Sequence, residues 1–401
     1  MINRLTRVSS ASPVRFVRAL SPRDPHEEHR VSTPLELLTD LCFVVAVAQA
    51  SAGLHHAIAE DHIGHGLIAF GIAFFAIWWT WLNFTWFASA YDNDDVVYRL
   101  LTILQIIGVL LVAAGIPGVF EDNFVLVVMG YVVMRIALVI QWLRAARGDS
   151  RTRRTCLRYA GALVLVQVMW IAILAVPHEY RPLAWIPLAA LDLCVPMWAE
   201  RTGATPWHPE HIVDRYAAFF IIVLGESILA ATLAIQGAWT DLAHASGALV
   251  VLVGGVLVVF GMWWLYFARD AGVVLERARD EGTRFEYVWG FGHYFIFASG
   301  AAIGAGLAVR AEYWAHPEEI PRLASAAAVT VPIAVLMAAL YLLQLRQHDP
   351  SPRAGLPFSI AIALVLACTF SAFPELLAGL VLAALLVTEL RQVARTSAVP
   401  G

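Results

Sequence analysis

The stretch "FFIIVLGESILAAT", Phe219 to Thr232, is almost wholly apolar, yet Glu226 and Ser227 lie at its centre. Neighbouring apolar residues extend the run to 213–236, and a helix of this length can cross about 30 Å of hydrocarbon. A charged side chain inside a membrane helix costs about 2.5–3.5 kcal/mol, so it usually faces protein or water. The stretch therefore predicts a membrane helix that carries an acid near its middle.

The composition of the whole chain is that of a protein with many membrane helices. Of the 401 residues, 60% are hydrophobic and 14% are charged, whereas soluble domains carry about 25% charged residues. We therefore expect an all-α multi-pass membrane protein. Apolar runs predict about twelve membrane helices, at 35–57, 65–89, 98–117, 120–143, 157–176, 182–200, 213–236, 245–268, 285–309, 323–346, 356–372 and 374–392.

The distribution of arginine predicts the orientation of these helices. All 27 basic residues are Arg, and 23 of them fall in the termini and in the loops on one side of this map. Three lie on the other side, at Arg181, Arg310 and Arg322, and Arg135 lies inside a span. Because positive charge collects on the cytoplasmic side, we expect both termini in the cytoplasm.

The sequence also contains an internal similarity between its two halves. "FAIWWTWLNF" in the second span is similar to "FGMWWLYF" in the eighth. One span earlier in each half, "VVAVAQAS" can be aligned with "IIVLGESI", which places Gln49 opposite Glu226. These two similarities suggest two six-helix halves related by a parallel repeat. We expect a flexible Arg-rich cytoplasmic arm at 1–33, halves at 34–200 and 201–392, and a cytoplasmic tail at 393–401.

The first span begins with two acids on one helix face. Glu36 and Asp40 are four residues apart, and Asp40 lies about 8 Å from the start of the span. Favourable interaction with the helix dipole explains Glu36, but this effect fades beyond the first turn. Asp40 and Glu226 are therefore candidate ion-binding residues, with Ser227, Gln49 and Arg215 as neighbours on the two helices. A hydrogen bond between helices is the alternative role for Glu226.

A second set of charges has the pattern of an ion pair. Arg135 and Asp192 both lie about 12 Å from the cytoplasmic ends of their predicted helices. We expect the two side chains to pair, either as a gate or as a structural contact, unless Arg135 extends to the lipid headgroups instead.

Two polar loops give weaker signals. Asp92 and Asp94 in "YDNDDVVYRLL" could form a mouth that attracts cations, or the Asp residues of this loop could cap the third span. On the other side, "HHAIAEDHIGH" carries weak candidates for metal ligands, without the spacing of a known motif. These are His55, His56, His62 and His65.

Other classes of function find little support in the chain. The four cysteines are widely separated, which indicates free thiols and no disulfide framework. We find no P-loop, dinucleotide fingerprint, HExxH or GxSxG motif, so we expect no cofactor. The expected partners are the bilayer, anionic lipids at the Arg-rich loops and an unknown small solute or ion, with no nucleic acid.

Three motifs, in order along the chain, resemble the signature regions of the bacterial low temperature requirement A (LtrA) family. They are "ELLTDLCFVVAVAQ" at 36–49, "WWTWLNFTWFASAYDNDD" at 78–95 and "DRYAAFFIIVLGESI" at 214–228. Asp214 stands where the family usually has Glu. The resemblance implies a polytopic protein of the bacterial inner membrane but no molecular activity.

Three kinds of function remain after these arguments. The ionisable residues at several depths favour a secondary transporter or an ion or proton pathway, in which Glu226 is the protonation or cation site. The alternative is a membrane enzyme or lipid-handling factor that uses Glu36, Asp40, Asp92, Asp94 and Arg215 with a divalent metal, or a sensor or scaffold for membrane adaptation.

Overall fold

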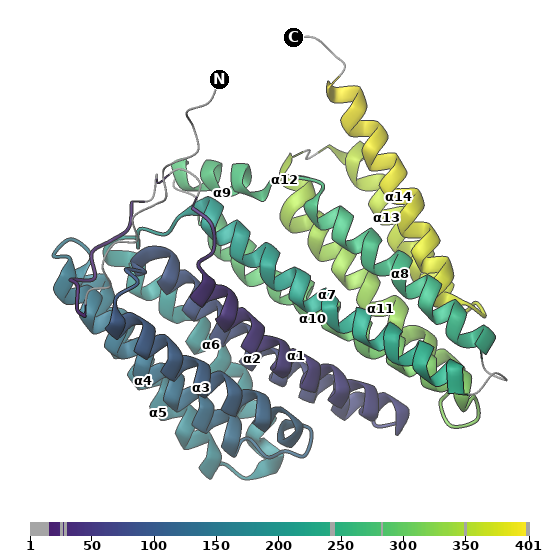
Figure 1. Cartoon of the computed structure of the whole chain (residues 1–401), viewed down its shortest axis with the longest axis horizontal. Coiled ribbons are helices and arrows are strands. Elements are labelled where there is room, and N and C mark those ends of the chain that lie inside the picture. Colours follow the sequence, from purple (N-terminus) through teal and green to yellow (C-terminus); the bar gives the residue numbers. More distant parts are fainter. Residues whose placement is uncertain are drawn as a thin grey trace, which may run out of the picture. The chain divides into compact units, whose positions relative to one another are not determined.

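The computed structural model describes residues 16–24, 27, 30–240, 245–281, 284–348 and 351–397, and this part of the chain contains helices and no strand (Figure 1). Much of the expected arm at 1–33 and the end of the expected tail lie outside the described residues. The long helices are α1 (Pro34–Ala59), α2 (Ile63–Tyr91), α3 (Val96–Val119), α4 (Val125–Gly148), α5 (Arg153–Ala172), α6 (Arg181–Ala199), α7 (Pro209–Thr240), α8 (Ala245–Phe267), α10 (Phe285–Ala315), α11 (Arg322–Leu340), α13 (Pro352–Cys368) and α14 (Pro374–Ser397).

Nine helices in the described part of the chain are long and apolar enough to cross a membrane. They are α1 to α6, α8 together with the helix that follows it, α10 and α11, and a shorter apolar helix covers Gly355–Cys368. Many of their apolar side chains are exposed, as expected of surfaces that face lipid. The chain is therefore an all-helical protein with the character of a multi-pass membrane protein.

One helix was not expected from the sequence. Helix α9 (Ala271–Asp280) follows α8, and the side chain of Asp270 caps it by accepting a 2.8 Å hydrogen bond from the amide of Gly272. Val274, Leu275 and Ala278 are buried on one face. This helix has too few apolar residues to stand out as a span, and only its helical periodicity could have indicated it.

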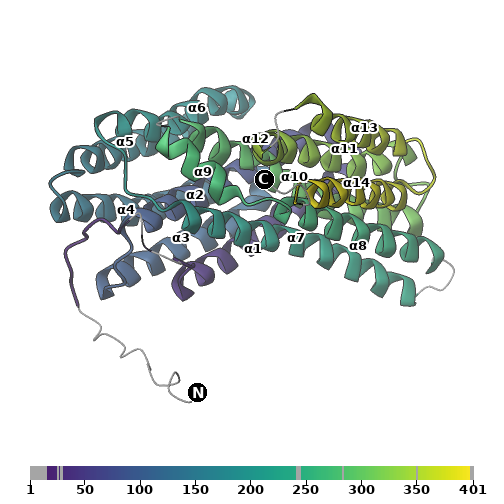
Figure 2. The same ribbon diagram turned by 90° about the horizontal axis from the view of Figure 1, so that it is seen from above.

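The contacts divide the chain into two compact units. Unit 1 comprises Met1–Glu27, Trp86–Gly108 and Tyr131–His208, and unit 2 comprises Glu28–Thr85, Val109–Gly130 and Pro209–Gly401. Within unit 1, α5 packs along α6 (Figure 2). Within unit 2, α7 and α11 pack on α10, α14 packs on α8, and α1 contacts both α7 and α10. The halves at 34–200 and 201–392 and the internal repeat stay predictions.

Small residues allow the helices of unit 2 to approach closely. A Cβ atom on Gly304 of α10 would lie 3.2 Å from the amide nitrogen of Ser227 on α7, and one on Gly306 would lie 2.1 Å from the carbonyl oxygen of Ala328 on α11. Gly300, four residues before Gly304, faces Val223 of α7. Small residues four apart commonly form such seams between membrane helices.

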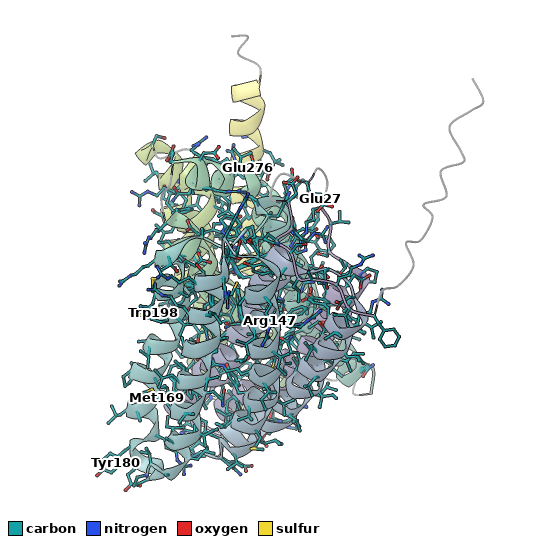
Figure 3. All side chains as sticks on the ribbon, turned by 90° about the vertical axis from the view of Figure 1, so that its left-hand side faces the viewer. Glu27, Arg147, Met169, Tyr180, Trp198 and Glu276 are labelled. Carbon is teal, nitrogen blue, oxygen red and sulfur yellow. The ribbon has the colours of Figure 1, made fainter. Side chains whose placement is uncertain are left out.

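The outer surface of unit 1 is strongly apolar along α5 and α6. Met169 and Trp198 project from these helices, and Tyr180 projects from the turn between them (Figure 3). Leu165 and Val168 on α5 are more than half exposed. Such a surface is stable only where lipid or another apolar partner covers it.

Candidate functional site

The first functional side chain is positioned by the cap of α1. Thr33 is the N-cap residue, and its hydroxyl oxygen accepts a 3.3 Å hydrogen bond from the amide of Glu36. The carboxylate of Glu36 in turn accepts a 2.7 Å hydrogen bond from the amide of Thr33. This reciprocal capping box, followed by Pro34, begins the helix and fixes the direction of the Glu36 side chain. Glu36 is buried despite its charge.

Asp40 lies one turn further along α1 and is fully buried. Its Oδ1 atom accepts hydrogen bonds from Nη2 of Arg215 on α7, at 2.5 Å, and from Nε1 of Trp81 on α2, at 2.9 Å. Its other oxygen, Oδ2, has no hydrogen-bond partner among the described residues, and neither do Nε and Nη1 of Arg215. A buried ion pair with unused donors and acceptors is expensive, which marks a position where function can outweigh stability.

Helix α7 presents two basic side chains to the two acids of α1. His211 and Arg215 are four residues apart, and Nε2 of His211 lies 3.2 Å from Oε1 of Glu36. All four side chains are at most 1% exposed. Glu36, Asp40, His211 and Arg215 form what we call the buried quartet, in which two i, i+4 pairs face each other across a helix interface.

Aromatic rings enclose the quartet within unit 2. The indole of Trp81 stacks on Phe219 with 4.4 Å between ring centroids and meets the edge of Tyr216 at 4.9 Å. The guanidinium of Arg215 lies 5.8 Å from the ring centroid of Phe84. These apolar walls lower the local dielectric, so each charge in the quartet acts strongly on the others.

Other charged groups lie near the quartet at the start of α1. Arg30, in the segment that leads into α1, is buried and close enough to His211 to act on its charge. Asp214 accepts hydrogen bonds from the amide and the hydroxyl of Ser32, at 2.9 and 2.5 Å. Asp214 therefore links the segment before α1 to α7.

Glu226, the acid within "FFIIVLGESILAAT", is not part of the buried quartet. Glu226 is half-buried, and it lies eleven residues beyond Arg215, which is about 16 Å along α7. Its Cγ is 3.3 Å from the position that a Cβ on Gly304 would occupy, so the seam with α10 passes directly beside it. Ser227 is buried, and its hydroxyl donates a 3.4 Å hydrogen bond to the carbonyl of Gly300.

Two further expected neighbours are also separate from the quartet. Gln49 on α1 is exposed, and α7 stays helical through Gly225, whose own face meets no neighbouring atom within 4 Å. In the structure, the site therefore extends across α1, α2 and α7 at the level of Asp40, and Glu226 is a distinct position further along α7.

The aspartates of the second motif belong to unit 1 and bind nearby groups. Asp94 is exposed and accepts two hydrogen bonds of 2.7 Å from Arg99. Asp92 is buried and accepts a 2.8 Å hydrogen bond from the amide of Asp94. Asp95 caps α3 by accepting a 2.6 Å hydrogen bond from the amide of Tyr98, as the capping alternative predicts for an acid of this loop.

Asp95 is also the centre of a small electrostatic network in unit 1. It accepts hydrogen bonds from the amide of Arg18 at 2.7 Å and from Nη2 of Arg144 at 2.6 Å. Burial alone would raise the pKa of Asp95, but the two amides of Arg18 and Tyr98, with the Arg144 guanidinium, outweigh it and lower the pKa below its usual value.

Arg135 and Asp192 meet in the interior of unit 1. Nη2 of Arg135 binds Oδ2 of Asp192, and the same oxygen accepts a 2.9 Å hydrogen bond from Nε1 of Trp170. The other oxygen, Oδ1, has no partner among the described residues. The guanidinium of Arg135 also lies 5.3 Å from the ring centroid of Tyr131. The pair therefore resembles the Asp40 site in every local contact.

The histidines of the 55–65 segment, around the turn from α1 to α2, do not gather around one point. Nε2 of His55 is 2.5 Å from Glu312, His62 lies 3.8 Å from Glu60, and His65 contacts the carbonyl of Phe120 at 2.9 Å. His55 and His56 pack ring against ring. Within the described ranges, the group of three or more possible ligand atoms that lie close together is His316, Glu318 and Glu319, all exposed.

A second buried polar cluster in unit 2 surrounds His293 of α10. Nδ1 of His293 donates a 2.7 Å hydrogen bond to the carbonyl of Trp289, which leaves Nε2 as the acceptor in the neutral ring. Nε2 then accepts from the hydroxyl of Tyr266 and from Nε2 of Gln344 at 3.3 and 3.4 Å. Gln344 lies on a π-helical turn, Tyr341–Leu345, at the end of α11.

Sequence reasoning missed two members of the Asp40 site, His211 and Trp81. The predicted span begins at 213, so His211 lies just outside it, although its spacing of four from Arg215 matches that of Glu36 and Asp40. Trp81 is part of a tryptophan-rich motif, and only the packing of α2 on α1 shows which of its indoles reaches the carboxylate. Trp78 and Trp79 are fully buried, but the residues aligned with them in the eighth predicted span, Trp263 and Trp264, are exposed.

Comparison with known proteins gives a family but no activity. Residues 31–390 match the family described as "Bacterial low temperature requirement A protein (LtrA)". An uncharacterized protein of Rhizobium meliloti (strain 1021) is 29% identical over 281 residues, which is 67% of this chain and 66% of that protein, slightly less than two thirds. No solved structure shows a significant match.

Proposed function

We propose, from the premise that the chain belongs to the bacterial low temperature requirement A (LtrA) family, that it is a secondary transporter or an ion or proton pathway. In this proposal the buried quartet binds the coupling proton or cation. The observation that carries the proposal is the fully buried set of two carboxylates, one guanidinium and one imidazole between α1 and α7.

The chemistry of the quartet supports reversible binding of a single positive charge. Glu36 and Asp40 carry two negative charges when ionised, Arg215 supplies one permanent positive charge, and His211 is the residue type whose ordinary titration lies near neutral pH. Arg30 adds a positive charge nearby and would favour release of the bound proton or cation. A cluster that is close to charge balance can gain or lose one proton at moderate cost.

The unpartnered oxygen of Asp40 supports the same role. Both donors converge on Oδ1, so Oδ2 is the atom that remains available for a proton or a cation. Arg215 keeps two further nitrogen atoms free for an alternative partner. In this proposal, loading of Asp40 weakens its bond to Arg215 and thereby loosens α1 from α7, which couples binding to helix movement.

The finer features of topology belong to this proposal too. α7, α13 and α14 would complete about twelve spans, with both termini in the cytoplasm of the bacterial inner membrane, and the halves at 34–200 and 201–392 would rock about the site. Glu226, with Ser227 and Gln49, would form a second binding position deeper in the bilayer. Asp92 and Asp94 would line the cytoplasmic approach, and Arg135 with Asp192 would be the gating or structural pair.

Proton flux into liposomes tests the proposal. The purified protein is reconstituted with a pH-sensitive dye inside the vesicles, and a potassium diffusion potential drives protons inward, with Na⁺ and K⁺ gradients tested in parallel. We expect Asp40→Asn and His211→Gln to reduce ion flux at least tenfold, and Glu226→Gln to reduce it as well. Asp192→Asn is measured in parallel, because its carboxylate has the same kinds of partner but no facing acid and histidine. An unchanged flux in this variant would assign the Arg135–Asp192 pair a structural role, and a reduced flux a gating role.

Two results would end the proposal. One is a wild-type protein that moves no ion faster than protein-free vesicles. The other is a wild-type flux that survives in both Asp40→Asn and His211→Gln, each shown by gel filtration to be folded. The enzyme alternative has less support, because Asp40 already pairs with Arg215 within unit 2 and Asp94 already pairs with Arg99 within unit 1.

A further inference from the structure

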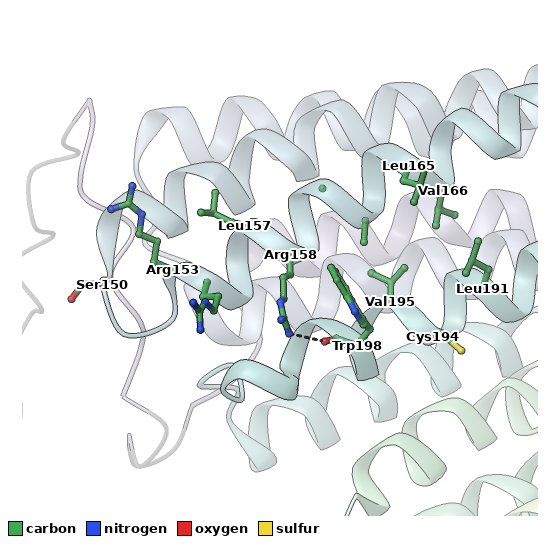
Figure 4. A pocket seen from close by; sticks show the side chains of 13 residues that line it. Ser150, Arg153, Leu157, Arg158, Leu165, Val166, Leu191, Cys194, Val195 and Trp198 are labelled. Carbon is green, nitrogen blue, oxygen red and sulfur yellow. Dashed lines mark hydrogen bonds between the residues drawn. The ribbon is translucent and has the colours of Figure 1, made fainter.

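A groove lies between α5 and α6 in unit 1, on the apolar surface to which Leu165 and Trp198 belong (Figure 4). Its volume is about 840 Å³. Three arginines stand at one end, Arg153, Arg154 and Arg158, all from the first two turns of α5. The remainder is lined mostly by apolar side chains, among them Leu157, Leu165, Val166, Leu191 and Val195.

The length of the groove matches one leaflet of a bilayer. From Arg153 to Val166 the lining follows α5 for thirteen residues, which is about 20 Å of helix. A hydrocarbon core of about 30 Å gives each leaflet about 15 Å of acyl chain. A groove with basic residues at one end and an apolar lining over the rest therefore has the dimensions of one lipid: headgroup at the arginines, acyl chain along the helices.

The arginines at the headgroup end are free to bind an anion. Arg153 and Arg154 are exposed and form no ion pair among the residues that the structure describes. The nearby carboxylate of Asp149 is engaged by the amide of Arg151 and by the hydroxyl of Thr152, at 2.9 and 3.0 Å.

Arg158 is held at the edge of the groove by Trp198. Its guanidinium carbon lies 5.0 Å from the centroid of the Trp198 ring, and Nη1 donates a 3.4 Å hydrogen bond to the carbonyl of Trp198. This contact orders one of the three cations before any ligand arrives, which reduces the entropy lost on binding. The amide groups at the start of α5 add to the positive field, because Thr152 makes no side-chain cap.

A glycine keeps the middle of the groove open. Gly161 lines it, and a Cβ atom built on this residue would meet no atom within 4 Å. An isolated glycine inside a membrane helix often permits the close approach of another helix, as Gly304 and Gly306 do in unit 2. At Gly161 no other part of the described chain uses the space, so the missing side chain leaves room for a ligand.

We infer that this groove is a binding site for one anionic phospholipid. The phosphate of the lipid would bind Arg153, Arg154 and Arg158 by charge-assisted hydrogen bonds, and one acyl chain would lie along the apolar walls past Gly161. The positive charge of the three arginines favours an anionic lipid over a zwitterionic one, and the apolar lining favours a ligand with an acyl chain over inorganic phosphate. The inference does not depend on the transport proposal.

Native mass spectrometry of the delipidated full-length protein tests the site. The protein in detergent is titrated with phosphatidylglycerol or with phosphatidylcholine of the same acyl chains, and inorganic phosphate is added as a competitor. We expect one phosphatidylglycerol to bind at least about tenfold more tightly than phosphatidylcholine. We expect the preference to disappear in the triple variant Arg153→Gln, Arg154→Gln, Arg158→Gln.

Two further variants separate this site from general attraction between charges. The triple variant Arg277→Gln, Arg346→Gln, Arg391→Gln removes the same charge from exposed positions elsewhere and should keep the preference. Gly161→Leu fills the groove without changing any charge and should weaken phosphatidylglycerol binding at least about tenfold. Both variants should elute from gel filtration as the wild-type protein does.

Several results would overturn the inference. The control triple variant could lose phosphatidylglycerol as fully as the first, which would indicate unspecific electrostatics. Gly161→Leu could bind the lipid unchanged, or inorganic phosphate could displace it at equal concentration, which would indicate an anion site without an acyl chain. A change of oligomeric state in Gly161→Leu with unchanged lipid binding would assign the groove to a second copy of the chain.

Discussion

Asp40 and Asp192 are bound by the same kinds of partner, one arginine and one tryptophan each, although they lie in different units. Each is fully buried, and each uses one oxygen to accept from an arginine Nη2 and a tryptophan Nε1 while the second oxygen has no partner among the described residues. The difference lies beyond these contacts, because only Asp40 has a second acid and a histidine beside its arginine. The two sites therefore allow a structural role to be separated from a functional one.

Removal of one partner from the Asp40 site should destabilise the protein strongly. Asp40→Ala leaves the Arg215 guanidinium buried without its counter-charge, and we expect a loss of about 3–5 kcal/mol in the free energy of unfolding. Asp40→Leu combined with Arg215→Met should recover most of this loss, because no unpaired charge is left. Unfolding by sodium dodecyl sulfate titration measures both. A double variant that is less stable than Asp40→Ala would contradict the assignment.

Burial should make two ion pairs of similar geometry contribute differently to the stability of the protein. Arg310 binds Glu375 through Nε at 3.0 Å and also Ser325, and the two charged side chains are at most 1% exposed. Arg99 and Asp94 are about half exposed. We expect Glu375→Ala to cost about 3–5 kcal/mol and Asp94→Ala less than about 1 kcal/mol in stability. Equal losses in thermal unfolding would show that burial does not set the strength of these pairs.

The change in stability when a glycine is replaced by alanine should depend on the space around that glycine. Gly306→Ala would place a methyl group 2.1 Å from the Ala328 carbonyl oxygen, so we expect a clear loss of stability from displaced backbone. Gly304→Ala needs a shift of only a few tenths of an ångström and should cost less. Gly161→Ala, with open space around it, should raise stability by about 0.5–1 kcal/mol. A different order in the melting temperatures would contradict the packing of α10 against its neighbours.

The contribution of the Asp95 network to stability should be lost at low pH. Its pKa in the folded protein is lowered, so the carboxylate stabilises the fold fully above the unfolded pKa of about 3.9, and this contribution disappears as the pH falls through the lower folded value. The difference in melting temperature between wild type and Asp95→Asn should thus be large at pH 7 and shrink below about pH 4. A difference that is constant with pH would mean that the carboxylate charge is not responsible.

The sequence predicts an all-helical chain with many membrane helices because the length and polarity of an apolar run are local properties. It predicts Glu36 and Asp40 on one face for the same reason, and equal depth correctly suggests that Arg135 meets Asp192. It does not predict that His211 and Trp81 join Asp40, because their contact depends on how α1, α2 and α7 rotate about their axes. For the same reason it overestimates how closely Glu226 and Gln49 are associated with the other charges.

The wide turn at Tyr341–Leu345 has a consequence for tolerance to mutation along its helix. A π-helical turn holds one residue more than the α-helical turn it replaces, so residues after it are out of phase with those of α11 by about 100°. Gln344 lies within this turn, and its Nε2 is 3.4 Å from Nε2 of His293. Deleting a single residue here would rewind the segment, turn the amide toward another neighbour and leave the imidazole without that donor, whereas the same deletion in a surface loop would go almost unnoticed.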